Sequence, residues 1–226
     1  MVRGGESMFG KVRRRINQIV NNQKGSTSIY FIIFMIFFLP FAIWVGVHLP
    51  VKYEATYTVK QMTSNTADSI VSRLDKEALA RGVVWIDPVE AEDVARRMIQ
   101  TTLNLDDDWF SSEEGILNHD NDDGPFPFHF VEIRDSYSLQ NEFPIDERVD
   151  GEIILPEEKG VYVYVLNGLP YGDEVKFKGL LPIDKTSVIV RANIPVSTGS
   201  LFGVAEGTVI SKTGVSEAQI YIREES

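Results

Sequence analysis

The hydrophobic pattern of the chain begins with one long uncharged run. Residues 29–47 read IYFIIFMIFFLPFAIWVGV, which is 19 positions without a charged side chain. A helix of this length, at about 1.5 Å per residue, spans roughly 28 Å and matches the ~30 Å hydrocarbon core of a bilayer. Pro40 inside the run and Pro50 just after it each remove a helical hydrogen bond. The pattern therefore predicts a kinked transmembrane helix whose membrane part covers about residues 29–47.

The pattern then changes to that of an amphipathic helix. Residues 51–80 contain neither Gly nor Pro, and their apolar side chains recur at steps of three and four. The recurring positions are Val59, Met62, Ala67, Ile70, Val71, Leu74 and Ala78. Gly82 is a suitable helix stop, so we predict one long helix over residues 26–81. A second helix is predicted from the N-cap Asp87 of "DPVE" to about Leu105.

From Phe128 onward the hydrophobic period shortens to two, which is typical of strands. The predicted strands cover residues 128–136, 151–156, 161–167, 174–179, 186–196, 206–215 and 218–224. Their short connections carry Gly, Pro or Asn, which favours a mainly antiparallel sheet. Helices that precede strands indicate the α+β class. Residues 82–226 are therefore expected to form an α+β domain.

The distribution of charge predicts the orientation of the chain in the membrane. The net charge is −11, but residues 1–25 carry six basic side chains and one acidic one, whereas residues 26–226 carry 16 basic and 32 acidic ones. By the positive-inside rule, residues 1–25 form a cytoplasmic leader and the domain lies outside the cell. A start at Met8 instead of Met1 would keep most of the positive charge. The acidic domain repels phosphate backbones, which excludes nucleic acid as a partner.

Little in the sequence indicates catalysis. The chain has no cysteine, three histidines (His48, His119 and His129), and no nucleophile elbow, zinc-protease motif, Walker A motif or dinucleotide fingerprint. A zinc site formed by His119, Asp120 and His129 would match no standard ligand spacing. We therefore predict a protein that is not an enzyme and needs no cofactor.

One acidic loop, HDNDDG at residues 119–124, suggests calcium because oxygen ligands suit that cation. Asp120, Asp122 and Asp123 are the candidate ligands. An EF-hand would need an acidic residue at loop position one and a glutamate at position twelve, where His119 and Phe130 stand instead. A solvated acidic turn is the favoured interpretation.

Two stretches carry a family resemblance: "KGSTSIYF" at residues 24–31 and "SVIVRANIPVSTGSLFGVAEGTVISKTGVSEAQIYI" at residues 187–222. With them the chain resembles the TadE-like proteins, the minor pseudopilins of tight-adherence (Flp-type) pili, within the type IV pilin-like superfamily. The resemblance implies that a prepilin peptidase cuts after Gly25 and leaves Ser26 as the new N-terminus. It also implies a long apolar helix and an extracellular domain that contains strands.

The resemblance further implies a structural subunit at the cell membrane or in a surface pilus. Its partners would be the membrane, a prepilin peptidase, other pilin-like subunits, a secretion platform and its ATPase. The family usually has glutamate at the fifth position after the cleavage glycine, where this chain has Tyr30. Two alternatives stay open: Ser26, Thr27 and Ser28 are helix N-caps, or the chain is an uncleaved single-pass protein whose outer domain binds a ligand or partner.

Overall fold

The computed structural model describes residues 23–112, 116–144, 148–168, 174–201 and 204–218. It divides into two compact units, Met1–Pro50 and Val51–Ser226, which are described separately. Most of the predicted basic leader, residues 1–25, lies outside the described residues, as does most of the predicted last strand, residues 218–224.

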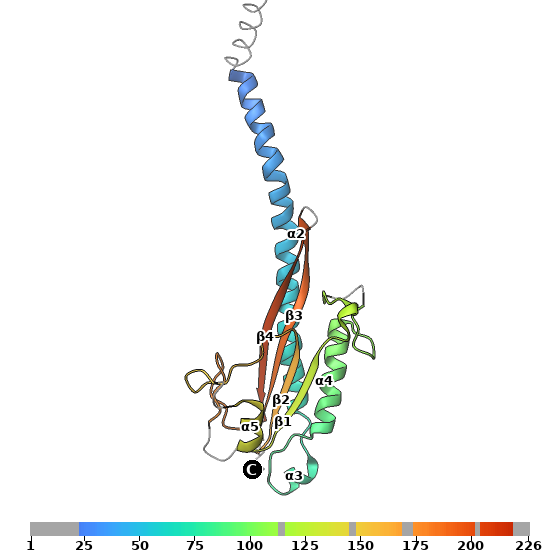
Figure 1. Cartoon of the computed structure of the whole chain (residues 1–226), viewed down its shortest axis with the longest axis vertical. Helices are drawn as coiled ribbons and strands as arrows, with labels where there is room; N and C mark the ends of the chain where they lie inside the picture. The colour runs from blue at the N-terminus through green and yellow to red at the C-terminus, as the bar shows by residue number, and fades with distance from the viewer. Residues whose placement is uncertain (1–22, 113–115, 145–147, 169–173, 202–203, 219–226) are drawn as a thin grey trace, which may run out of the picture. The chain divides into compact units, whose positions relative to one another are not determined.

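The first element is helix α2, Gln23–Val71, which is bent and contains Pro40 and Pro50 (Figure 1). The predicted long, kinked N-terminal helix is confirmed, but it ends at Val71 and not at residue 81. Two local features end it. The backbone of Leu74 bridges to Ile86, and the Asp75 carboxylate caps a separate short helix, α3 (Lys76–Ala80). A strong N-cap inside an amphipathic stretch thus divides it into two helices.

Helix α4, Pro88–Leu103, forms as predicted. Asp87 is its N-cap, and Oδ1 of Asp87 accepts hydrogen bonds from the backbone N–H groups of Val89 and Glu90 at 2.9 and 3.2 Å. The helix ends at Asn104, which adopts the left-handed conformation that asparagine tolerates well. The buried side of α4 consists of Ala91, Val94, Ala95, Ile99 and Leu103.

The sheet has four strands in the order β1-β2-β3-β4. Their bounds are Phe128–Ile133, Gly160–Leu166, Ser187–Leu201 and Val204–Glu217. β2 pairs antiparallel with β3 and β3 pairs antiparallel with β4, so the sheet is mainly antiparallel. β1 and β2 pair in parallel, which the pattern did not predict. The chain between them is long enough for this crossover and includes helix α5, Ser136–Glu142.

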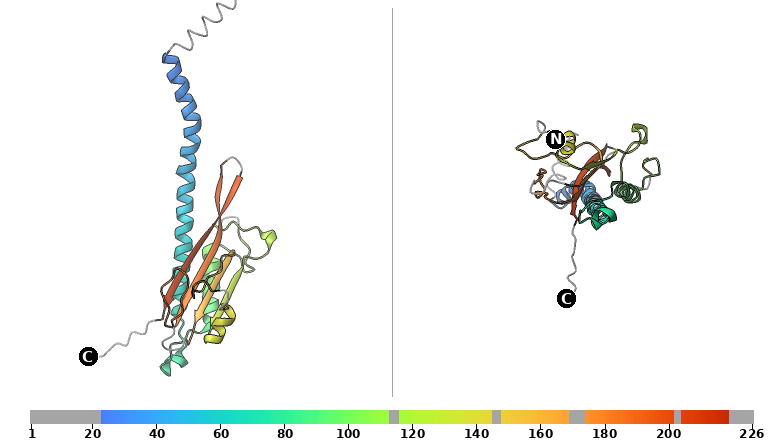
Figure 2. Two further views of the ribbon diagram at one scale, coloured as in Figure 1. Left: turned by 60° about the vertical axis from the view of Figure 1, so that its left-hand side comes forward. Right: turned by 90° about the horizontal axis from the view of Figure 1, so that it is seen from below.

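Two hydrophobic cores lie on opposite faces of the sheet within the unit Val51–Ser226. On one face, the second part of α2 and helix α4 pack against alternate residues of β2 and β3, among them Val163, Val190 and Ile194 (Figure 2). On the other face, Tyr164 and Ile189 pack with the segment after α5, including Phe143 and Phe177. Every residue of β2 is buried, as expected for a strand covered on both faces.

Two predicted strands, at residues 151–156 and 174–179, are not strands of this sheet. They form only isolated bridges, such as Ile153 with Phe177 and Val175 with Ile183. Their alternating pattern has a different cause, because Ile153, Val175 and Phe177 point into the second core while their neighbours face solvent. The alternation of apolar and polar residues in these two segments therefore indicates an extended chain with one buried side, and not a strand paired in the sheet.

Candidate functional site

The apolar part of α2 is the most prominent functional feature of the unit Met1–Pro50. Its large side chains are exposed along the whole run, with Tyr30 70% and Phe37 75% exposed. Among the described residues, α2 is the one helix that is long and apolar enough to cross a membrane. Exposed aromatic pairs lie along it: Phe34 stacks on Phe38 at 5.0 Å, and Phe41 on Trp44 at 6.4 Å between ring centroids. Apolar side chains on all sides are what a helix needs to lie in lipid.

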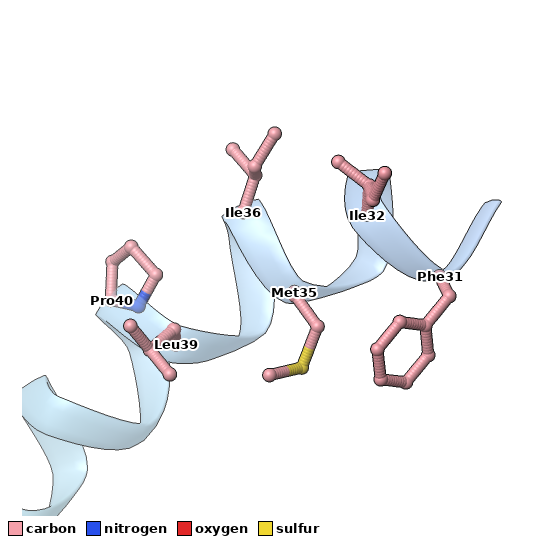
Figure 3. A pocket seen from close by; sticks show the side chains of 6 residues that line it. All are labelled: Phe31, Ile32, Met35, Ile36, Leu39 and Pro40. Carbon is pink, nitrogen blue, oxygen red and sulfur yellow. The ribbon is translucent and has the colours of Figure 1, made fainter. Parts of the chain in front are cut away.

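A shallow apolar groove lies on this run just before Pro40. Figure 3 shows Ile32, Ile36 and Pro40 in one row of side chains and Met35 and Leu39 in the next. Both rows follow from the spacing of four residues on a helix surface. Phe31 begins the second row, four residues before Met35. The groove offers dispersion contacts and no polar group, so it suits a lipid chain or another apolar helix.

The predicted processing site lies inside α2. The helix already includes Gln23, so Gly25 and residues 26–28 are helical, and the hydroxyl residues do not act as its N-cap. The alternative interpretation of these residues as the N-cap of the helix is therefore wrong. The side chains of Ser26 and His48 lie outside those that the structure describes. Tyr30 is on the helix surface, at a position where its side chain is accessible to a neighbouring molecule.

In the unit Val51–Ser226, α2 and β4 approach each other very closely. A Cβ atom added to Gly214 would lie 2.5 Å from the carbonyl carbon and oxygen of Thr63 and 2.7 Å from the nitrogen of Ser64. The strand therefore rests directly on the helix backbone. Thr63 and Thr66 are completely buried at this contact side of α2, and the Thr63 hydroxyl donates to the carbonyl of Lys60 at 2.9 Å. Small residues allow this close packing of strand and helix.

The polar groups of the acidic loop, residues 119–124, form hydrogen bonds within the loop and to Ser111, and among the described residues they do not converge as metal ligands. Oδ1 of Asp120 accepts the backbone N–H of Asp122 at 3.0 Å, which starts the short helix η1, Asn121–Asp123. Asn121 bonds Ser111, and Nε2 of His119 lies 2.8 Å from the carbonyl oxygen of Gly124. Among the described residues, no three Asp, Glu or His side chains converge to hold a metal. The carboxylates of Asp120, Asp122 and Asp123 therefore do not form the suggested calcium site in this structure.

His129 lies on strand β1 and is not part of the acidic loop. Its ring stacks on that of Tyr162 with centroids 4.9 Å apart and planes 7° apart. The strand register continues this row across the sheet, from Tyr162 to Arg191 and then to Thr213. Nη1 of Arg191 donates to the Thr213 hydroxyl at 3.2 Å. Burial lowers the pKa of Arg191 and raises that of Tyr162, so the row holds partly desolvated polar groups.

A second group that the sequence did not predict surrounds Trp109. This residue has a positive φ of 69°, which is unusual for a bulky side chain. Asp106 fixes the turn, since its Oδ1 accepts the N–H groups of Asp108 and Phe110 at 3.0 and 2.9 Å. The guanidinium of Arg96 lies 5.5 Å from the Trp109 ring centroid and 4.6 Å from that of Phe128. Phe126, which follows the acidic loop, belongs to the core that contains α4, and its side chain is 2% exposed.

A polar cleft lies where the end of α2 meets α3 and α4. Its lining consists of Ser72, Arg73, Leu74, Asp75, Lys76, Glu77, Asp87 and Glu90. Asp75 and Asp87 already use their carboxylates as helix N-caps. The cleft is therefore lined by both acidic and basic side chains, which lie at the ends of three helices.

No protein-family model, curated protein or solved structure matches this chain.

Proposed function

We propose that this protein is a membrane-anchored, pilin-like structural subunit of a TadE-like pilus or secretion apparatus. One observation carries the proposal: α2 is a single helix with two different environments. Its residues 29–47 expose apolar side chains, while Ala55, Val59, Met62 and Ile70 of the same helix belong to the core of the outer domain. The first part of such a helix can hold the subunit in the bilayer, while its second part forms the core of the outer domain. This arrangement suits a subunit that is anchored in the membrane before it joins an assembly.

The use of polar groups in the outer domain supports a structural role. The buried amide of Asn167 bonds the backbone of Ile86, and that of Asn193 donates to the carbonyls of Pro156 and Glu158 at 2.8 Å each. Asp75, Asp87 and Asp135 are helix N-caps. These groups are engaged in holding the fold and not in preparing a reaction site.

In this proposal the leader faces the cytoplasm and the acidic domain faces outward. The partners are the membrane, a prepilin peptidase, other pilin-like subunits, a secretion platform and its ATPase. The exposed apolar rows of α2, including the groove before Pro40, are the surface on which sister helices would pack. In lipid, such contacts rest on close side-chain packing because there is no hydrophobic driving force between helices.

Tyr30 decides which kind of subunit fits best. A carboxylate at this position, near the N-terminal end of the run, would be costly to bury in lipid unless it were paired. Tyrosine avoids this cost, but it cannot form an ion pair with the new N-terminal amine of a neighbour. A minor, initiating or tip subunit, which needs fewer such contacts, fits the chain better than a major filament subunit.

Co-expression with an active prepilin peptidase tests the proposal. We expect N-terminal sequencing of the membrane-extracted protein to begin at Ser26, and Gly25→Arg to abolish that cleavage. Gly25→Ala is the matched control, because it keeps a small residue at the junction. An intact Met1 beside an active peptidase and a cleaved reference prepilin would contradict processing. The absence of an acidic residue at position 30 would then favour the second candidate, an uncleaved single-pass protein with a partner-binding outer domain.

A further inference from the structure

Helix α2 carries two tyrosines with an unusual exposure just after the uncharged run. Tyr53 is 73% exposed and Tyr57 is 62% exposed, one helical turn apart. The opposite side of the same turns is buried, with Ala55 4% and Val59 0% exposed. The two rings therefore form a stripe, the tyrosine stripe, on the side of the helix that faces away from the core of the outer domain.

Chain connectivity places this stripe close to the end of the span. Tyr53 follows Val47 by six residues and Val51 by two, and Lys52 is the first Lys, Arg, Asp or Glu after the run. Six helical residues cover about 9 Å, and six extended ones cannot exceed roughly 20 Å. The headgroup layer adds about 5–8 Å to the hydrocarbon core on each side. Along the helix, the backbone of Tyr53 therefore lies at the outer limit of the headgroup layer, and that of Tyr57 about 6 Å further out, provided that the run is in the bilayer.

The direction of helical side chains extends this reach. Side chains on an α-helix lean toward its N-terminus, so each ring covers the turn that precedes its own Cα. For Tyr53 and Tyr57 that turn lies on the side of the span. The Tyr57 hydroxyl accepts a hydrogen bond from Nε2 of Gln61 at 2.7 Å, which leaves its own proton free to donate. Lys52 is exposed beside Tyr53 and can place its ammonium among phosphates.

We propose that the tyrosine stripe binds the headgroup layer of the membrane that residues 29–47 cross. The rings lie among the glycerol and carbonyl groups, and the hydroxyls donate to ester or phosphate oxygens, as amphipathic rings do at bilayer interfaces. The stripe then fixes the depth of the start of the outer domain. This inference rests on the proposed membrane location of the run.

Site-directed spin labelling of the full-length protein in phosphatidylcholine–phosphatidylglycerol vesicles tests the proposal. The chain has no cysteine, so Tyr53→Cys, Tyr57→Cys and their controls each carry one label. Tyr137→Cys is the matched aqueous control, because Tyr137 is a tyrosine on α5 with the same 73% exposure as Tyr53. Phe37→Cys, at a position 75% exposed on the apolar run, reports whether the span itself is in lipid.

We expect labels at positions 53 and 57 to be several-fold less accessible to a water-soluble nickel quencher than the label at position 137, with oxygen access retained. Labels at 53 and 57 that behave like the label at 137 would overturn the proposal. Loss of access to both quenchers would also overturn it, because a protein neighbour and not lipid would then cover the stripe. A label at position 37 that is accessible to nickel would instead contradict the membrane span, and with it the proposed function.

A second measurement separates the contribution of the two tyrosines from that of the chain connection to residues 29–47. A label at Glu54→Cys is compared with and without the double change Tyr53→Ser and Tyr57→Ser, and Tyr137→Ser is the control. We expect nickel access at position 54 to rise several-fold only when the stripe is removed. Unchanged access would show that chain connectivity alone sets the depth, and it would overturn the role of the stripe.

Discussion

The side chain of Asn167 joins segments far apart in the sequence at the end of β2. It is completely buried, accepts the N–H of Ile86 at 2.9 Å, and donates to the Ile86 carbonyl at 2.9 Å and to the Glu132 carboxylate at 3.0 Å. Its amide therefore satisfies both backbone groups of a residue on the α3–α4 connection. The side chain of Glu132 is 11% exposed and also pairs with Arg134.

Asn167→Ala should lower the free energy of unfolding by about 2–4 kcal/mol, because it leaves both buried backbone groups of Ile86 without partners. Urea unfolding of the full-length protein in detergent micelles, followed by tryptophan fluorescence, measures this change. Asn141→Ala, at an exposed position of α5, is the matched control and should stay within about 0.5 kcal/mol of the wild type. Equal effects of the two variants would contradict the role given to Asn167.

Asp135 makes the N-terminus of α5 sensitive to acid. Its carboxylate accepts the Ser138 backbone N–H at 2.7 Å and the Ser138 hydroxyl at 2.8 Å, and these bonds, the backbone one foremost, hold the pKa of Asp135 below its ordinary value of 3.8. A lowered folded-state pKa means that the cap stabilises α5 above the unfolded pKa of about 3.9 and is lost as the pH falls through the folded value.

An NMR titration of the Ser138 amide proton should therefore show a midpoint below 3.8. Ser138→Ala removes the hydroxyl donor and should raise the midpoint toward the ordinary value. Asp135→Asn can still cap the helix, and it should abolish the titration. A midpoint at or above 3.8 in the wild-type protein would rule out the stabilising bonds to the carboxylate.

At the scale of elements, the contact between β4 and α2 depends on one missing side chain. The Cβ of an alanine at position 214 would meet backbone atoms of Thr63 and Ser64 at 2.5–2.7 Å, and backbone cannot move aside as a flexible side chain can. Gly214→Ala should destabilise the domain by roughly 1–3 kcal/mol through this overpacking. The matched control is Ser211→Ala, at an exposed position of the same strand.

Amide hydrogen exchange of the full-length protein locates the effect. Gly214→Ala should increase exchange in β4 and in the turn of α2 around Thr63, while α4 stays protected, because the strand must move off the helix. Faster exchange spread evenly over the domain would instead indicate a general loss of stability. No change in either element would contradict the close contact.

The helices and strands that could be predicted are those whose hydrophobic pattern is set by residues close together in the sequence. α2, α4, β2, β3 and β4 have long regular periods, and Asp87 marks the start of α4 with a recognisable cap. The missed features depend on distant partners. The parallel pairing of β1 with β2 and the bridge of Leu74 with Ile86 have no local signal.

The same limit applies to the candidate site. The apolar run and Gly25 are visible in adjacent residues, so the long apolar helix could be predicted. The partners of Asn167 and Gly214 lie far away in the sequence, and the placement of Arg96 over Trp109 depends on an unusual backbone turn. Short-range patterns contain no information on such contacts. The stripe of Tyr53 and Tyr57 became visible only with the packing of α2, which buries the opposite side of the same turns.

At the scale of the whole molecule, charge is distributed on the two sides of the apolar run. Residues 1–25 carry six basic side chains against one acidic, and residues 26–226 carry 32 acidic against 16 basic. Basic residues are retained on the cytoplasmic side during insertion, so this asymmetry predicts an outward-facing domain. The orientation matters for every proposed partner, because the proposed peptidase and ATPase would meet the cytoplasmic part of the chain and not the part that faces outward.

Labelling with a membrane-impermeant maleimide tests this orientation, since the chain contains no cysteine of its own. In cells that lack a prepilin peptidase, so that the leader is retained, Asp107→Cys at an exposed position should react without permeabilisation, whereas Glu6→Cys in the leader should react only after it. Replacing Arg13, Arg14 and Arg15 with glutamine removes half of the basic residues of the leader, so a fraction of molecules should then insert in the opposite orientation. In that variant, labelling at position 107 in intact cells should fall while labelling at position 6 rises. Reaction at position 6 in the same intact cells without the triple replacement would contradict a cytoplasmic leader, and unchanged orientation after the triple replacement would show that these arginines do not set it.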